Sequence, residues 1–336
     1  MAGDHDGWAR VPELDAVRGF AVGGAVIAQT WRVTGVPATV APGVLDPMRQ
    51  LLAVVAEGCF LPIFAVLFGV SFSMVADRAT ARAEQPWLVL LRRVVALGVL
   101  GLVHQLFQPG EALLPYALAG LVILLPAAGL PRWVVLAAGL AATAGAAVLL
   151  GDGFGLVPGL FLLGMAGARF RIVEVLRERA WLVAMVFALA LPAAVLAGKW
   201  EFRTSYLDLA SSAPAVAGLL GALAYTTGLL LLLRTSFGEL LGAVLRPMGR
   251  MALSNYLGAT VLILVADALL DSNSYGALLL LAVAIILLQT VFSALWLRWL
   301  RFGPVEWLWR CVTWWEWAPI WQRRPQPASL GLPHLG

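Results

Sequence analysis

Long apolar runs separated by short polar segments fill almost the whole chain. A helix that crosses the hydrocarbon core of a membrane needs about 20 mostly apolar residues. The pattern therefore predicts about ten transmembrane helices. We place them at 13–33, 50–76, 88–107, 112–129, 132–150, 153–170, 180–198, 213–233, 248–270 and 274–300.

The connections between these runs predict how the helices are joined. Those at 129–132 and 151–153 are so short that the flanking helices must run antiparallel and side by side. The second run is longer than a simple span requires and has room for a kink at Pro62. We detect no internal repeat, so an inverted-repeat transporter architecture has no support.

Basic residues are distributed unequally between the two ends of these helices. With the N-terminus inside, nineteen of the 23 basic residues fall on the cytoplasmic side, and only Arg32, Arg49, Lys199 and Arg203 fall outside. Cytoplasmic loops of membrane proteins carry an excess of Lys and Arg. We therefore expect both termini in the cytoplasm and an even number of helices.

Composition supports the membrane class. The chain is 61% hydrophobic and 12% charged, and its mean hydropathy is +0.88. A soluble domain has about 25% charged residues. The fold class predicted is all-α, a polytopic membrane helix bundle, located in a bacterial cytoplasmic (inner) membrane with the lipid bilayer as its surroundings. A homo-oligomer is left open.

Other features of the composition exclude further classes. The net charge of +4 comes from arginines at helix ends, so we expect no nucleic-acid partner. Cys59 and Cys311 are too far apart in sequence to indicate a disulfide or a metal site. Asp4, His5 and Asp6 differ from the basic start of a signal peptide.

The regions outside the bundle of 13–302 divide into three. Residues 1–12 are expected to be a cytoplasmic N-terminus. Residues 303–322 are rich in tryptophan, which prefers the membrane–water interface, and predict an interfacial cytoplasmic segment. Residues 323–336 are polar and Pro-rich and predict a disordered tail.

Ionisable side chains within the hydrocarbon are costly, so each one suggests a functional site. His104, near the outer end of its helix, has the chemistry of a general base. Glu111 follows a Gln-Pro-Gly turn that can return its carboxylate to the imidazole. Glu57 lies about two turns into the second helix. Alternatively, His104 is a helix-end hydrogen-bonding group, Glu111 a first-turn acid favoured by the helix dipole, and Glu57 a protonated or paired acid.

Arginines gather on the inner half. Arg18, Arg92, Arg93 and Arg250 are candidates for a basic cavity that binds phosphate groups. The alternatives are an intrahelical ion pair of Arg18 with Asp15 and ordinary positive-inside arginines at the other positions.

A polar pocket is predicted beside these arginines. Its candidate residues are Asp15, Asn255, Tyr116 and Ser254. For Asn255, packing between helices through hydrogen bonds is the alternative.

Four sequence segments resemble the YeiB-like bacterial membrane proteins, the domain of unknown function 418 (DUF418) group. They are LDAVRGFAVGGAVI (14–27), FLPIFAVLFGVSFS (60–73), RRVVALGVLGLVHQLFQPGEALLPYALAGL (92–121), and GRMALSNYL (249–257) followed by FGPVEWLWRCVTW (302–314). Residues 125–245 match only as hydrophobic helices. Glu111 stands where the family usually has Asp, and the first outer loop lacks the histidine of more distant acetyl-transferring relatives.

The opening helix is also similar to the wider transmembrane acyltransferase superfamily. That resemblance implies transfer of an acyl group from cytoplasmic acyl-CoA to a small-molecule or glycan acceptor, with acyl-CoA as donor substrate and no metal. His104, supported by Glu111 or Glu57, would deprotonate the acceptor. The alternatives are a proton-coupled transporter or exporter of a small metabolite, and a non-catalytic membrane scaffold.

Overall fold

The computed structural model describes residues 11–34, 36, 39–41, 44–151, 153–203, 211–269 and 274–322. Within these ranges the chain is an all-α bundle, apart from a short antiparallel pair, β1 (Thr39–Ala41) and β2 (Val44–Leu45). The predicted disordered tail (323–336) and most of the predicted N-terminal segment lie outside the described residues, and α1 begins at Pro12.

The first half of the chain supplies the centre of the bundle. Its helices are α1 (Pro12–Thr34), α2 (Pro47–Leu52), α3 (Gly58–Arg82), α4 (Pro86–His104), α5 (Leu113–Ala119), α6 (Leu125–Ala127) and α7 (Arg132–Leu149). Two π-helical turns, η1 (Ala53–Glu57) and η2 (Gly120–Leu124), join α2 to α3 and α5 to α6.

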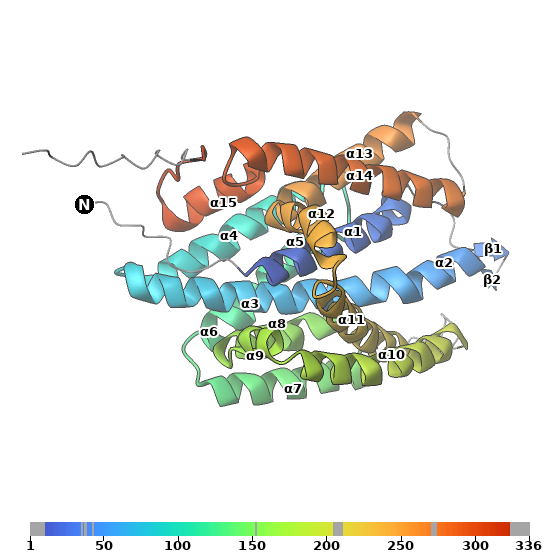
Figure 1. Cartoon of the computed structure of the whole chain (residues 1–336), viewed down its shortest axis with the longest axis horizontal. Coiled ribbons are helices and arrows are strands. Elements are labelled where there is room, and N and C mark those ends of the chain that lie inside the picture. Colours follow the sequence, from blue (N-terminus) through green and yellow to red (C-terminus); the bar gives the residue numbers. More distant parts are fainter. Residues whose placement is uncertain are drawn as a thin grey trace, which may run out of the picture.

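The second half completes the bundle around this centre. It contains η3 (Phe154–Leu156), α8 (Val157–Arg169), α9 (Ile172–Glu178), α10 (Ala180–Arg203), α11 (Ala213–Leu232), α12 (Gly238–Arg250), α13 (Ala252–Leu269), α14 (Tyr275–Trp299) and α15 (Pro304–Trp314). In Figure 1, α3 runs along the long axis, with α4 and α13 to α15 above it and α7 to α11 below it. Contacts of α3 with α4, α8 and α11 join the two sides.

All ten predicted segments are helical, which confirms the helical membrane bundle. By length and composition, seven helical segments of the described chain can each cross a membrane, or eight if the bent pair α8 and α9 forms one span. Of the ten predicted spans, α1 and the stretch from α5 to α6 are not among these helices. α5 to α6 is short. α1 is long enough to cross a membrane, but Asp15, Arg18 and Arg32 make it less apolar than the seven.

The charges of α1 are tolerated because other helices surround it. It packs against α3, α12, α13 and α14. Ten of its residues are buried, among them the polar side chains of Gln29 and Thr30. A helix enclosed by protein meets little lipid, so it does not need the uniform apolar surface of an outer span.

Two prolines within spans follow π-helical turns. Pro62 comes one turn after η1, and Pro126 comes directly after η2. A proline inside a helix lacks the N–H that would bond the carbonyl four residues earlier and crowds that carbonyl. In η1 the carbonyl of Val55 accepts a hydrogen bond from the Tyr225 hydroxyl at 2.9 Å. Pro62 itself lies within the regular helix α3, and the irregularity near it is the widened turn that ends at Glu57.

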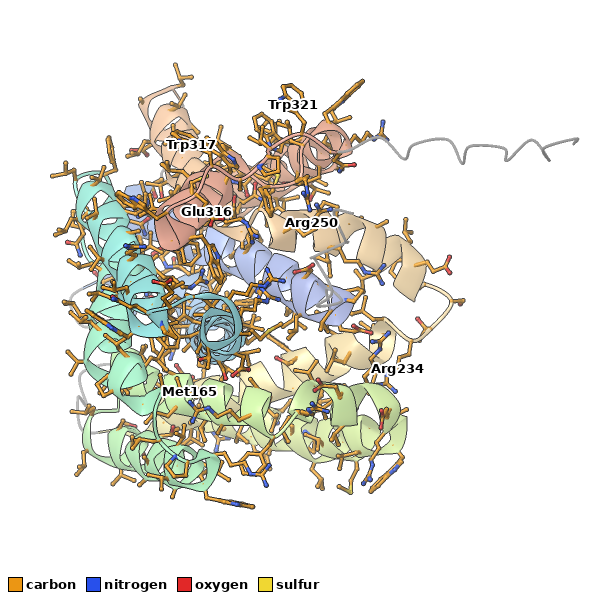
Figure 2. The ribbon with its side chains drawn as sticks, turned by 90° about the vertical axis from the view of Figure 1, so that its left-hand side faces the viewer. Met165, Arg234, Arg250, Glu316, Trp317 and Trp321 are labelled. Carbon is orange, nitrogen blue, oxygen red and sulfur yellow. The ribbon has the colours of Figure 1, made fainter. Side chains whose placement is uncertain are left out.

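The tryptophan-rich segment folds back on the bundle. α15 packs on α4 and α13. Trp317 and Trp321 extend outward from the chain that follows it, and Trp317 is 83% exposed (Figure 2). Both side chains are exposed, whereas α15 itself is held by packing on α4 and α13.

Two glycines allow α1 and α12 to touch through their backbones. A Cβ at Gly249 would overlap the carbonyl oxygen of Asp15, and one at Gly19 would overlap that of Leu245. Close approach of small residues is a usual means of helix association in membranes.

We expect Gly249→Ala to destabilise the protein by about 1–3 kcal/mol because the two backbones must separate. Gly145→Ala is the matched control, since its Cβ would meet no atom within 4 Å and alanine favours a helix. Thermal unfolding of both variants in detergent measures the difference. Equal midpoints would contradict the packing described here.

Candidate functional site

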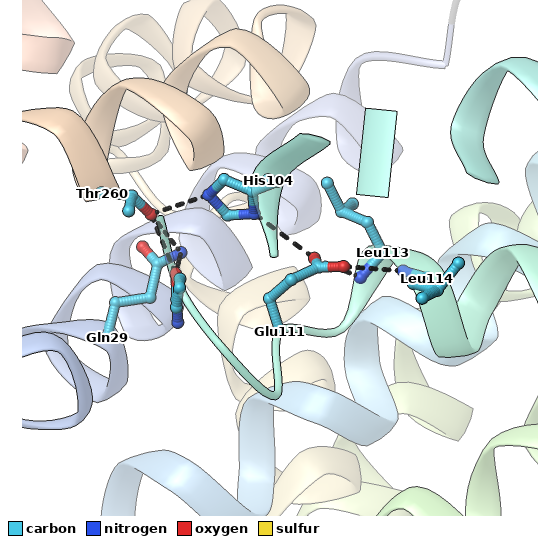
Figure 3. Close-up of polar contacts among 7 residues, drawn as sticks. Gln29, His104, Glu111, Leu113, Leu114 and Thr260 are labelled. Atoms are coloured by element: carbon cyan, nitrogen blue, oxygen red, sulfur yellow. Dashed lines mark hydrogen bonds and ion pairs between the residues drawn. The ribbon is translucent and has the colours of Figure 1, made fainter. Parts of the chain in front are cut away.

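His104 and Glu111 lie against each other at the predicted outer end of α4 (Figure 3). The Nδ1 atom of His104 is 3.4 Å from Oε2 of Glu111. Both residues are buried, with 4% and 1% of their surfaces exposed. The Gln-Pro-Gly turn, with Gly110 in the left-handed region, returns the chain so that the two side chains meet. A buried carboxylate next to Nδ1 fixes the ring and favours a proton on that nitrogen.

Glu111 also holds the start of α5. Its carboxylate accepts hydrogen bonds from the backbone N–H groups of Leu113 and Leu114, at 2.5 and 2.8 Å. A Cβ on Gly101 would overlap the backbone of Leu114, so the glycine lets the capped turn lie directly on α4. Because the first N–H groups of a helix lack partners within it, this carboxylate stabilises the turn that positions it.

A buried network continues from the second ring nitrogen of His104. Nε2 lies 3.0 Å from the hydroxyl of Thr260 on α13, and that hydroxyl is 2.9 Å from Oε1 of Gln108. Gln29 of α1 donates to the same oxygen of Gln108 at 3.3 Å. The ring of Tyr256 is 5.5 Å from the imidazole. Three elements distant in sequence thus meet at the imidazole, and sequence reasoning did not find Thr260, Gln108 or Gln29.

Glu57 has a different set of partners. Its carboxylate accepts hydrogen bonds from Arg32, at the end of α1, and forms an ion pair with Arg49 of α2 at 2.8 Å. The guanidinium of Arg49 lies 5.4 Å from the centre of the Trp31 ring. No contact joins Glu57 to His104 among the described residues. The residues within one helical turn of Glu57 offer no partner for its carboxylate. Arg32 and Arg49 come from other segments.

Two of the four inner arginines come together. Arg93 lies close enough to Arg18 and Arg78 for their charges to repel. Arg18 pairs with Asp15 at 3.2 Å and donates to Ser71 at 2.5 Å. The guanidinium of Arg93 stacks on Trp309 at 3.8 Å, and its buried Nε has no hydrogen-bond partner. We call Arg18, Arg78 and Arg93 the arginine cluster.

The other two inner arginines contact different groups. Arg92 lies over the ring of Trp315 at 5.3 Å, and Arg250 donates to the carbonyl oxygen of Arg301 at 3.1 Å. Both contacts are with the chain after α14. The structure therefore divides the four predicted arginines between the cluster and the docked C-terminal segment, and it adds Arg78.

The predicted polar pocket is also divided. Asn255 donates to Ser293 at 2.9 Å and to the carbonyl of Met248 at 3.2 Å, so it joins α13 to α14 and α12. Tyr116 donates to the carbonyl of Leu61 at 3.0 Å. Asp15 forms the intrahelical pair with Arg18. Asn255 thus has the packing role that was its alternative, and Asp15 and Arg18 form the intrahelical ion pair that was theirs.

Ser254 belongs to a cap built across the fold. Glu306 of α15 accepts hydrogen bonds from the N–H groups of Leu253 and Ser254, at 2.7 and 2.9 Å, and contacts the Ser254 hydroxyl. Burial raises the pKa of Glu306, although these hydrogen bonds oppose the shift. The carboxylate thus satisfies the first turn of α13 from a segment 50 residues further along the chain.

Metal ligands do not gather in the described part of the chain. No group of three His, Cys, Asp or Glu side chains there is placed to hold a metal ion. Both cysteines are free thiols in this structure.

Comparison with known proteins identifies bacterial relatives of unassigned function. An uncharacterized 39.9 kDa protein from the amylase 3′ region of Bacillus acidopullulyticus is 33% identical over 93% of this chain and 96% of its own length. YxaH of Bacillus subtilis is 40% identical over 21% of this chain and 19% of its own. YeiB of Escherichia coli is 41% identical over 19% and 18%.

No solved structure matches the chain. The family model described as "Protein of unknown function (DUF418)" matches residues 170–316. Together with the nearly full-length relative, this match shows that the chain belongs to the YeiB-like DUF418 family of membrane proteins.

Proposed function

We propose that the protein is an acyltransferase of the bacterial cytoplasmic membrane, which moves an acyl group from cytoplasmic acyl-CoA to an acceptor on the outer side. The observation that carries the proposal is the buried contact of His104 with Glu111, which leaves Nε2 facing a hydroxyl group. A carboxylate that orients an imidazole, whose other nitrogen takes a proton from a hydroxyl, is a recurrent arrangement in acyl transfer.

In the proposed reaction the acceptor hydroxyl takes the place of Thr260 at Nε2. His104 removes its proton, the acceptor oxygen bonds to the acyl carbon, and the carbon–sulfur bond of the thioester breaks. The thiolate of CoA leaves and takes up a proton. An amine acceptor would react in the same way. Because His104 and Thr260 are buried in contact, admission of the acceptor requires that α4 and α13 separate at this point.

The arginine cluster supports a donor site on the predicted inner side. Arg18 pairs with Asp15, and the buried Nε of Arg93 has no hydrogen-bond partner among the described residues. Guanidinium groups suit phosphate oxygens. Arg93 and His104 are eleven residues apart on α4, about 16 Å along its axis at 1.5 Å per residue. A donor bound through its phosphates near Arg93 could extend its thioester toward His104.

A proton-coupled transporter is the second candidate. The observation that favours it is the presence of π-helical turns within two apolar segments, one of which ends at the ion-paired Glu57. Such turns are frequent at functional sites. Proton-driven uptake of an unchanged metabolite into vesicles would decide for transport.

We expect His104→Ala to lower acyl transfer by about 100-fold or more, the usual contribution of a general base. The measurement is release of the CoA thiol and transfer of label from acetyl-CoA by the protein in membrane vesicles. Thr143→Val is the control, since Thr143 is buried on α7 away from the network. Full activity of His104→Ala would remove this residue from the mechanism.

Glu111 is expected to have two separable roles. Glu111→Ala should destabilise the protein by about 1–3 kcal/mol, because buried N–H groups at the start of α5 lose their acceptor. Glu111→Gln keeps one side-chain oxygen for the cap but removes the charge opposite Nδ1, so it should lose less stability than Glu111→Ala while transfer falls. Glu84→Ala, at an exposed position, is the control for thermal unfolding. If both Glu111 variants are as active per folded molecule as the unchanged protein, Glu111 has no role in orienting the imidazole of His104.

Arg93→Ala should raise the KM for acyl-CoA with little change in kcat, because it removes a contact to the phosphates and leaves the base intact. Arg93→Lys should restore part of the affinity, since charge is kept but the planar fork is lost. Arg298→Ala, at an exposed position near the end of α14, is the control. An unchanged KM for Arg93→Ala would exclude this donor site.

A further inference from the structure

A cavity of about 740 Å³ lies among α1, α3, α7, α8, α9, α11 and α12, apart from both the His104–Glu111 pair and the arginine cluster. Its volume is in the range that holds a drug-sized ligand. None of Arg18, Arg78, Arg93, His104 and Glu111 lines it. The proposed acyl transfer therefore does not account for this cavity.

The cavity has a charged end and an apolar end. Arg177, Arg234 and Arg246 lie at the predicted cytoplasmic ends of their helices, together with Glu13 at the start of α1. Thr226 and Leu230 lie one to two turns earlier on α11 than Arg234, so they line a deeper part. Val66 and Val70 of α3 and Leu163 of α8 line it as well.

The charges at the cavity suit an anion. Three arginines stand against one carboxylate among the lining residues. Glu13 pairs with Arg177 at 3.4 Å, and Arg234 donates to the carbonyl oxygens of Leu176 and Arg177. Arg246 makes no hydrogen bond or ion pair with the described residues and is exposed. Its guanidinium is therefore available to a ligand.

From this arrangement we infer that the cavity binds an amphiphile with one apolar chain and an anionic head. The chain would lie along Val66, Val70 and Leu230, which are apolar. The head, a phosphate or a carboxylate, would contact Arg246 and Arg234. A lysophospholipid and a fatty acid both have this chemistry.

Binding to the purified full-length protein tests the inference. The probes are palmitoyl lysophosphatidylglycerol, palmitate and the neutral monopalmitoylglycerol, measured by titration in a non-ionic detergent. We expect the two anionic probes to bind more tightly than the neutral one. Tighter binding of the lysophospholipid would identify a phosphate head, and tighter binding of palmitate a carboxylate head. Equal affinity for all three would overturn the inference.

Two variants locate the head and the chain. Arg246→Ala should weaken binding of the preferred anionic probe about tenfold, the effect of losing one charged hydrogen bond, whereas Arg298→Ala should not. Thr226→Phe narrows the deep end, so it should weaken binding of the palmitoyl probe more than that of its octanoyl counterpart. An unchanged chain-length preference would place the chain elsewhere.

The outcome is independent of the proposed transferase. Arg93→Ala should leave binding of these probes unchanged, because Arg93 does not line the cavity. If the protein binds these probes as expected but transfers no acyl group, the amphiphile site stands and the proposed acyltransferase function is wrong. Weakened binding of the probes by Arg93→Ala would instead place the amphiphile in the donor site, and the inference of a separate site in this cavity would be wrong.

Discussion

A charged or hydrogen-bonding side chain in a low-dielectric interior needs a partner, and this requirement organises the bundle. α1 carries Asp15, Arg18, Gln29 and Arg32, which would be costly next to lipid. Each of the four meets a partner, and for Arg18, Gln29 and Arg32 that partner includes a side chain of another segment. α12 can approach α1 closely because Gly19 and Gly249 leave space between the two backbones. Polar chemistry at the centre thus depends on small residues beside it.

The helices were predictable because hydropathy reports length and lipid exposure directly. All ten predicted segments are helical, but α12 was divided between a connection and the start of the next span. Its sequence places Glu239, Arg246 and Arg250 among apolar residues, and it packs against α1. α1 was predicted at 13–33, and its charged residues are accommodated because protein encloses it.

The meeting of His104 with Glu111 was accessible from the sequence because one tight turn joins them. Thr260 and Gln29 were not, since they come from helices far away in the chain. The same limit applies to Glu57, whose partners lie on α1 and α2, and to Ser254, whose partner is Glu306. A carboxylate in a hydrophobic run signals that a partner exists, but the local pattern does not identify it.

The cap that Glu306 provides has a mechanical consequence. It fastens the first turn of α13 to the docked terminal segment, and Thr260 lies two turns further along the same helix. A helix moves largely as a rigid rod, so a displacement of α15 would shift the hydroxyl beside the imidazole two turns away. The ring of Trp317 lies 5.5 Å from that of Trp307 on α15, so a contact made at Trp317 would be transmitted through this cap to the buried network.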